Sequence, residues 1–466
     1  MGLLRWKRCT KDFAMPDSDN IILPNALPTN GERVKRPTDP SGPALTLSAT
    51  SGNAYALSSD STREHFLFQV QAACGFQAGQ SRLPLNLSLV IDRSGSMDGE
   101  PLEQAKRACA LVVDMLKPTD VLSVITFEDG ADVVMPARRM TNKALVKDYI
   151  SRIHAGNTTN LYEGLVTACQ QVASVKTETS LNRVLLLTDG EPTAGTKDFP
   201  SIIGQVGEQK ARGITVSTLG YGPDFSDELL SGIARRSGGN YYYASRPQQL
   251  PGLFQREVES LLRITARNLR LRVYLPRGVS VRQVYGQQPV FGPRTAEVTL
   301  SDMEQGMGLL SLWELEMTPR PAGTYRVALA ELLYDDAVTG RPEKLSAEAV
   351  VDFTTDRPLI VSGADAQVSG EAVVAQAARA LDKAALALRA QQTDPEQAFI
   401  EMQQVKNLLM EQGKITQARL VSEAIAEAQS GVSLIKTLTQ IVYSLDQGKQ
   451  NSAGTEGADA VPQPAP

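Results

Sequence analysis

The pattern of apolar and polar positions divides the chain into segments of different character. The first clear pattern lies in EHFLFQVQAA, where Phe66, Phe68 and Val70 occupy alternate positions. This period of two predicts a strand that is buried mostly on one face. The residues before this region, 1–43, are rich in proline and polar side chains, which predicts a disordered N-terminal arm.

Between residue 85 and about residue 262, apolar runs alternate with amphipathic stretches. The runs LNLSLVID, VLSVITF, RVLLLTD and ITVSTLG are apolar on both faces, which indicates buried strands. Helical periodicity marks PLEQAKRACALVVDML and NLYEGLVTACQQVA, and also residues 142–153, 199–213 and 225–238. The alternation predicts an α/β fold with a mainly parallel sheet covered by helices on both faces. In such sheets, the binding crevice lies outside the carboxyl ends of the strands.

Beyond Thr265 the period of two returns. In RNLRLRVYL, alternate positions are apolar, and similar short runs separated by turn residues continue to about residue 356. This pattern predicts a small antiparallel β-sandwich. We assign residues 44–84 and 265–356 to this sandwich, and residues 85–264 to an α/β domain that is inserted in it with its two ends close together.

The C-terminal part is rich in Ala, Leu and Gln. A linker is expected around Ser362 to Ser369, followed by a helical region over residues 370–446 and a disordered tail over residues 447–466. One helix carries an apolar stripe, formed by Val432, Leu434, Ile435, Leu438, Ile441, Val442 and Leu445. Two interpretations stay open: the stripe packs inside its own bundle, or it is a docking surface for self-association.

Charge and composition narrow the class of partner. The 466 residues include 47 basic and 52 acidic residues, and the net charge of −5 is not collected in blocks. Nucleic acid is therefore not expected as a partner, because phosphate binding needs a concentrated basic face. The sequence contains neither a signal-peptide pattern nor an apolar run long enough to span a membrane. The four cysteines have no metal-ligand spacing, so we expect a reduced, soluble, cytoplasmic protein.

Oxygen-bearing side chains gather where the predicted α/β strands end. Asp92, Ser94 and Ser96 follow the first strand, Thr159 opens a helix, and Asp189 ends RVLLLTD. Alternate residues of the first loop can point toward one ion, and Gly95 permits close approach of the backbone. An all-oxygen set suits a hard divalent cation, Mg²⁺ or Mn²⁺ in preference to Ca²⁺, and does not suit zinc.

These residues resemble the metal-ion-dependent adhesion site of the von Willebrand factor A family: D-x-S-x-S, then a threonine, then an aspartate. The resemblance covers roughly residues 84 to 262, and it implies a Rossmann-like doubly wound fold. It also implies that Ser94 and Ser96 coordinate the ion directly, that Thr159 and the two aspartates complete the shell, partly through water, and that one coordination position is left for a partner's Asp or Glu. The flanking β region resembles bacterial stand-alone A-domain proteins and, more loosely, inter-alpha-trypsin inhibitor heavy chains.

Each motif has an ordinary structural explanation when it is taken alone. D-x-S-x-S occurs in turns, Thr159 could cap a helix, and Asp189 with Gly190 could end a strand. Their common order and placement favour the metal site. The alternative function is a metal-dependent hydrolase or phosphatase that uses the same acidic loop. The chain has two histidines and no G-x-x-x-x-G-K-[ST] loop. We therefore expect a non-enzymatic adaptor or scaffold that binds proteins through the metal.

Overall fold

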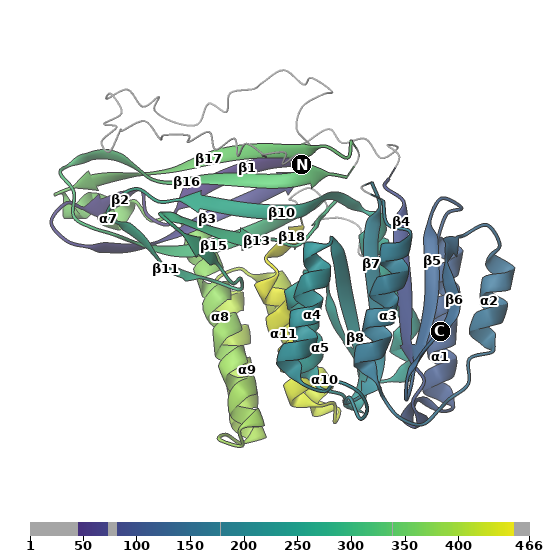
Figure 1. Cartoon of the computed structure of the whole chain (residues 1–466). Coiled ribbons are helices and arrows are strands. Elements are labelled where there is room, and N and C mark those ends of the chain that lie inside the picture. The colour runs from purple at the N-terminus through teal and green to yellow at the C-terminus, as the bar shows by residue number, and fades with distance from the viewer. Residues whose placement is uncertain (1–44, 73–81, 178, 338, 452–466) are drawn as a thin grey trace, which may run out of the picture.

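A computed structural model describes residues 45–72, 82–177, 179–337 and 339–451 of the chain. The arm expected over residues 1–43 and the end of the expected tail, residues 452–466, lie outside these described residues. Figure 1 shows a β-sandwich, an α/β domain on one side of it, and C-terminal helices that run alongside the α/β domain. The predicted fold class is confirmed, because the α/β domain is inserted between two segments of an antiparallel sandwich and helices follow.

The α/β domain is built on a sheet with the strand order β6-β5-β4-β7-β8-β9. Its strands are β4 (Leu85–Asp92), β5 (Val121–Phe127), β6 (Ala131–Arg139), β7 (Leu181–Gly190), β8 (Ile214–Asp224) and β9 (Tyr241–Ala244). Neighbouring strands are parallel except β5 and β6. The apolar pattern does not single out β6 or β9, because β6 is a largely exposed edge strand containing Pro136 and β9 has only 4 residues.

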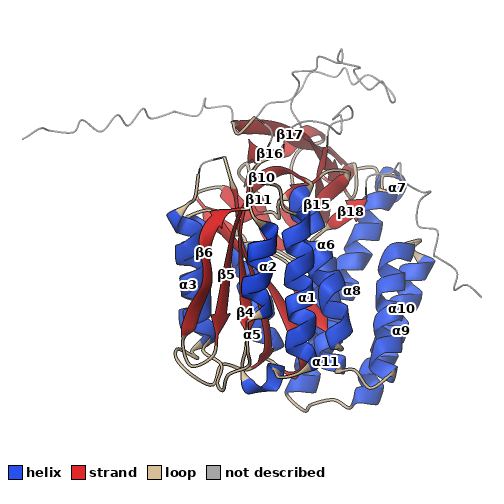
Figure 2. Cartoon of the chain, turned by 90° about the vertical axis from the view of Figure 1, so that its right-hand side faces the viewer, coloured by secondary structure: helices blue, strands red, loops and turns tan. Residues whose placement is uncertain are grey.

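Helices cover both faces of this sheet, as Figure 2 shows from the side of α1 and α2. They are α1 (Glu100–Met115), α2 (Lys143–Ser151), α3 (Leu161–Ser174), α4 (Phe199–Ala211), α5 (Asp227–Ser237) and α6 (Leu250–Leu262). Successive side chains of a strand point to opposite faces. Leu89 and Ile91 of β4 therefore pack with α1, α2 and α6, whereas Val90 packs with α3, α4 and α5.

The sandwich consists of two sheets that enclose an apolar core. One sheet has the order β1-β3-β15-β11 with β18 beside β15, and the other has the order β12-β13-β10-β16-β17-β2 with β14 beside β10. The first contains β1 (Leu45–Ser51), β3 (Thr62–Ala72), β11 (Val279–Val284), β15 (Met307–Met317) and β18 (Lys449–Asn451). The second contains β2 (Tyr55–Leu57), β10 (Ile264–Tyr274), β12 (Val290–Gly292), β13 (Thr295–Thr299), β14 (Met303–Glu304), β16 (Gly323–Asp336) and β17 (Pro342–Thr354). Phe66, Phe68 and Trp313 meet Leu271 and Val273 in this core.

The C-terminal helices begin earlier than expected. They are α7 (Arg357–Ser362), α8 (Ala366–Arg389), α9 (Pro395–Glu411), α10 (Ile415–Gln429) and α11 (Leu434–Asp446). The Asp365 side chain accepts a hydrogen bond of 2.9 Å from the backbone N–H of Val368 and caps α8. The expected linker over residues 362–369 is therefore wrong for its second half, which is helical.

The apolar stripe on α11 is buried by the chain itself. Leu438, Ile441 and Val442 lie in the core of the helical region, which supports packing within the bundle. The expectation of a disordered tail from residue 447 is wrong for Lys449–Asn451, which form β18 and pair with β15 of the sandwich. Three residues are too short to show a strand period, so only the neighbouring strand defines them.

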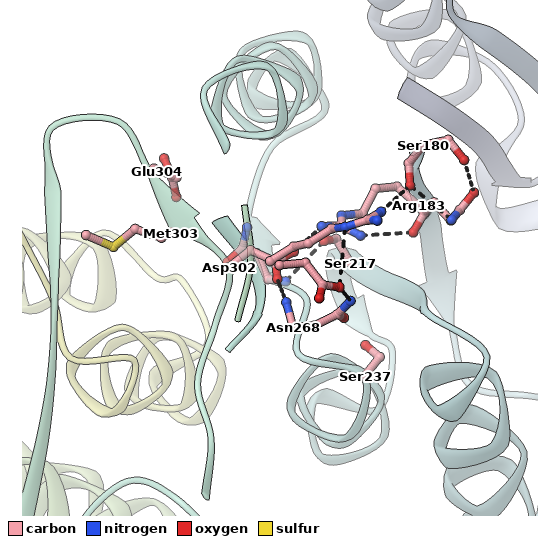
Figure 3. Close-up of polar contacts among 12 residues, drawn as sticks. Ser180, Arg183, Ser217, Ser237, Asn268, Asp302, Met303 and Glu304 are labelled. Atoms are coloured by element: carbon pink, nitrogen blue, oxygen red, sulfur yellow. Dashed lines mark hydrogen bonds and ion pairs between the residues drawn. The ribbon is translucent and has the colours of Figure 1, made fainter. Parts of the chain in front are cut away.

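A buried polar junction joins the sandwich to the amino ends of the α/β strands (Figure 3). Arg183, near the start of β7, forms an ion pair with Asp302, which precedes β14. Arg267 of β10 donates a hydrogen bond of 2.6 Å to the carbonyl oxygen of Ser180. The backbone N–H of Asn268 donates to Asp302 over 3.1 Å. The carboxyl ends of the parallel strands therefore lie at the edge away from the sandwich.

Two further sequence expectations concern cysteines and membrane spans. Cys109 and Cys169 are buried and free, whereas Cys9 and Cys74 lie outside the described residues. Among the helices of the described ranges, none combines the length and the hydropathy that a membrane span requires.

Candidate metal site

The two aspartates of the predicted site end adjacent parallel strands. Asp92 is the last residue of β4, and Asp189 lies one residue before the end of β7, its neighbour in the sheet. Both side chains therefore reach the edge of the sheet that faces away from the sandwich. The short helix Gly95–Met97 follows β4 and turns the serines of the first loop toward the same place.

Asp92 is completely buried, and both of its carboxylate oxygens accept hydrogen bonds. One accepts from the backbone N–H of Ser94 over 2.8 Å, and the other from the hydroxyl of Thr188 over 2.5 Å. Burial raises the pKa of Asp92 to about 6, and the neighbouring carboxylate of Asp189 adds to this rise. The sequence pattern missed Thr188, whose only sequence signal is its position beside Asp189.

The serine hydroxyls of the first loop converge on Asp189. The Oγ atoms of Ser94 and Ser96 are 3.1 Å apart, and they donate to Oδ1 of Asp189 over 3.4 Å and 2.9 Å respectively. Ser94 is buried and Ser96 is exposed, so the cluster opens to solvent on the Ser96 side. Burial also raises the pKa of Asp189.

The threonine predicted for the site lies close to the end of β7, on the loop of residues 156–160 before α3, which we call the second loop. Thr159 is 4% exposed, and a Cβ atom built on Gly190 would lie 3.8 Å from its hydroxyl oxygen. The hydroxyl of Thr158 instead donates to the carboxylate of Asp129. This contact supports Thr159 over Thr158 as the residue that faces the cluster. The helix N-cap is the next residue, Asn160, whose side chain accepts from the backbone N–H of Glu163 over 3.3 Å.

Backbone hydrogen bonds join the first loop to the second loop, and ion pairs join it to the turn between β5 and β6; the sequence pattern missed both kinds of contact. The backbone N–H of Gly156 donates to the carbonyl oxygen of Arg93 over 2.6 Å. The guanidinium of Arg93 pairs with Glu128 over 2.5 Å and with Asp132 over 2.7 Å. A Cβ atom on Gly156 would lie 1.5 Å from Oε2 of Glu128, so this position requires glycine while Glu128 keeps its place.

Gly95 does not have the importance that the sequence suggests. A Cβ atom on Gly95 would lie 3.5 Å from the carbonyl oxygen of Gly156, which is an ordinary van der Waals contact. Of these two glycines, Gly156 is therefore the one where an added side chain would meet a close contact, the Glu128 carboxylate.

The cluster opens into a cavity of about 730 Å³. It is lined by Ser94, Ser96, Asn157, Thr158, Thr159, Gly190, Glu191, Thr193, Pro223, Asp224 and Phe225. The last three residues lie at the end of β8 and in the loop before α5, and we call residues 223–226 the β8–α5 wall. The sequence pattern does not predict this wall, because its residues follow no metal-site motif.

The donor set fits a hard divalent cation. The hydrogen-bond donors to Asp92 and Asp189 in the described structure are hydroxyl and backbone N–H groups, so no basic side chain there balances the two buried carboxylates. No group of three or more His, Cys, Asp or Glu side chains in the described part of the chain could hold a metal ion. Hydroxyl oxygens would therefore supply the remaining ligands, and such oxygen donors favour Mg²⁺ or Mn²⁺ over zinc.

Comparisons with known proteins identify the family of the α/β domain. Residues 86–256 match the family profile of the von Willebrand factor type A domain. The chain is 31% identical over 280 residues to an uncharacterized protein of Synechocystis, covering 57% of this chain and 65% of the relative. It is 32% identical over 171 residues to human inter-alpha-trypsin inhibitor heavy chain H4, covering 34% of this chain and 18% of that protein. The matches thus span less than two thirds of these relatives' own length.

A solved structure shares the fold beyond the α/β domain. The structure of a von Willebrand factor type A protein from Catenulispora acidiphila superimposes with a TM-score of 0.68 at 19% identity, and the match covers 87% of this chain and 97% of that chain. At this identity the likeness concerns the fold. Together with the family match and the strand order, it shows that residues 86–256 of this chain form a von Willebrand factor type A domain.

Proposed function

We propose that this protein binds a protein partner through a divalent cation, Mg²⁺ or Mn²⁺. In this proposal Ser94 and Ser96 coordinate the ion directly, and Thr159, Asp92 and Asp189 complete its shell, some of them through water. An Asp or Glu of the partner takes the open position. The protein acts as an adaptor or scaffold.

The observation that carries the proposal is the convergence of hydroxyl groups on two carboxylates that lack a basic counterion. Burying ionised carboxylates without a counterion is unfavourable, and the raised pKa of Asp92 reflects this. A divalent ion would balance both charges. The exposed Ser96 and the adjoining cavity provide a route for a partner side chain to reach that ion.

The same geometry speaks against the hydrolase or phosphatase alternative. A nucleophilic Asp92 would have to reach the substrate, yet its side chain is completely buried. The described residues that line the cavity include no histidine that could serve as general base. Binding is therefore the function that the site supports best.

Thermal unfolding tests the metal site. We expect Mg²⁺ or Mn²⁺ at a hundred times its dissociation constant to stabilise the protein against EDTA by about 2.7 kcal/mol. Because the parts of the protein are expected to unfold together, this corresponds to a rise in melting temperature of about 3 °C. Asp189→Ala should abolish the rise, whereas Asp148→Ala on the exposed surface of α2 should keep it. An equal rise in the Asp189 variant would refute the site.

Water-proton relaxation of bound Mn²⁺ tests the open coordination position. Acetate, used as a model of an Asp or Glu side chain, should displace metal-bound water and lower the relaxivity, and acetamide at the same concentration should not. Equal effects of the two compounds would refute selective binding of a carboxylate.

A further inference from the structure

The β8–α5 wall is held from outside by the C-terminal helices. Lys436 of α11 is 5% exposed, and its ammonium group donates a hydrogen bond of 2.6 Å to the carbonyl oxygen of Phe225. The same group lies 3.4 Å from the centre of the Phe225 ring. Lys436 therefore contacts both the backbone and the side chain of a residue that lines the candidate metal cavity.

Further contacts fix the helix that follows the wall. Asp227, the first residue of α5, accepts hydrogen bonds from Arg389 of α8 and, over 2.7 Å, from the hydroxyl of Thr439 of α11. At the other end of α5, Arg235 pairs with Asp446 over 2.8 Å, and the hydroxyl of Tyr443 donates to the carbonyl oxygen of Gly239. Because α11 contacts both ends of α5, a shift of α5 or of the wall would have to break these contacts.

The charges around Lys436 also belong to the cavity. Burial lowers the pKa of Lys436 to about 8, whereas the carboxylates of Asp227, Asp224 and Glu191 favour its charged form. Asp224 and Glu191 line the cavity. The ammonium group of Lys436 thus lies beside an otherwise acidic side of the cavity, where it lowers the repulsion that an entering carboxylate would meet.

We propose that Lys436 is a positioning residue of the partner-binding site: from the C-terminal helical region it holds the β8–α5 wall and makes that side of the cavity tolerant of a partner carboxylate. The inference rests on the proposed function, since the wall matters only if a ligand binds there. It assigns the helical region a role in ligand binding beyond packing against the domain. Lys436 contacts none of the five proposed metal ligands in the described structure, so metal binding itself should be little changed.

Two measurements on Lys436→Met test the inference, with Lys383→Met on the exposed face of α8 as the control for loss of a lysine charge. In metal-free protein, amide hydrogen exchange at residues 224–227 should become faster in the Lys436 variant, and exchange in β7 should stay unchanged. With Mn²⁺ bound, the acetate concentration that gives half the relaxivity change should rise by about fivefold or more, because Lys436 no longer couples the β8–α5 wall to carboxylate binding. The control variant should behave as wild type in both measurements.

Thr439→Val provides a second variant with nearly the same volume and no change of charge. It removes the hydroxyl contact to Asp227 and should speed exchange at residues 224–227 as well, with a smaller effect on acetate binding. Unchanged exchange and acetate binding in the Lys436 variant would overturn the inference and leave the proposed function intact. Absence of any acetate effect in the wild-type protein would instead refute the proposed function, and the exchange comparison would then alone decide whether Lys436 holds the wall.

Discussion

At the scale of single residues, the candidate site is built from positions that are buried or tightly packed. Asp92 is buried among hydroxyl and backbone donors, and Gly156 lies where any side chain would meet Glu128. A buried carboxylate without a counterion destabilises the folded chain. A side chain at position 156 would require the Glu128 carboxylate to move.

The titration of Asp92 gives a prediction for the metal-free protein. Its pKa is raised from 3.8 to about 6 by burial, so the folded chain binds this proton more tightly than the unfolded chain. The resulting stability is fully present below pH 3.8 and is lost as the pH rises through about 6. In EDTA, Asp92→Asn should therefore gain stability relative to wild type between pH 4 and 7, by at most about 3 kcal/mol.

Urea unfolding at several pH values measures this difference. Asp148→Asn, which changes an exposed carboxylate, should show no comparable trend relative to wild type. A difference between Asp92→Asn and wild type that is the same at every pH would contradict the predicted titration.

The two loop glycines give a matched pair of substitutions. Gly156→Ala should displace the flexible Glu128 side chain and weaken its pairing with Arg93, at a cost of up to about 1 kcal/mol, since the added methyl group overlaps Oε2. Gly95→Ala should be nearly neutral, because its methyl group would make an ordinary contact. Melting temperatures in EDTA compare them, and an equal loss in both variants would mean that the loop contact is not the cause.

At the scale of elements, the amino and carboxyl ends of the α/β strands make different contacts. The amino ends of the strands meet the sandwich through a polar junction that includes the ion pair between Arg183 and Asp302. The carboxyl ends carry the candidate site, and α11 lies against α5 beside it. The contacts with the sandwich and the candidate site thus lie at opposite ends of the strands.

The ion pair at the sandwich junction should be costly to break from one side. Arg183→Met removes the ion pair of the largely enclosed Asp302, whose carboxylate still interacts with Arg267 and Lys210, so the free energy of unfolding should fall by about 1–3 kcal/mol. Asp302→Asn together with Arg183→Met should cost less than the two single changes added together, because neither variant group is then an unpaired charge. Urea unfolding of the four proteins measures this coupling, and purely additive effects would show that the pair contributes little.

At the scale of the whole molecule, the chain crosses between its parts several times. It passes from the sandwich into the α/β domain and back, continues through the helices, and returns to the sandwich as β18. Lys449 of this last strand pairs with Glu304 over 2.9 Å, and its ammonium group lies 3.5 Å from Oδ1 of Asn240 in the α/β domain. β18 thus links the helical region to the sandwich and contacts the α/β domain.

These connections predict cooperative unfolding of the described structure. We expect one calorimetric transition, which Mg²⁺ or Mn²⁺ shifts as a whole, because no part can unfold without exposing apolar contacts of another. A separate transition that does not respond to metal would show that the sandwich or the helical region is independent of the metal site.

The sequence by itself determined the parts of this protein that repeat a local pattern. Buried runs such as RVLLLTD and the helical periodicities define the α/β elements, because burial on both faces or on one stripe leaves a periodic trace. The rule that parallel strands end at one edge of a sheet then brings Asp92, Ser94 and Asp189 together, as found.

Only the tertiary structure decided the features that rest on contacts between distant segments. Examples are the close approach of Gly156 to Glu128, the pairing of β18 with β15, and the contact of Lys436 with Phe225, which lies 211 positions away in the chain. Such contacts follow no local period, since each is defined by a partner far away in the sequence. The physical reason is that periodicity records which face of an element is buried, and does not record against which element it is buried.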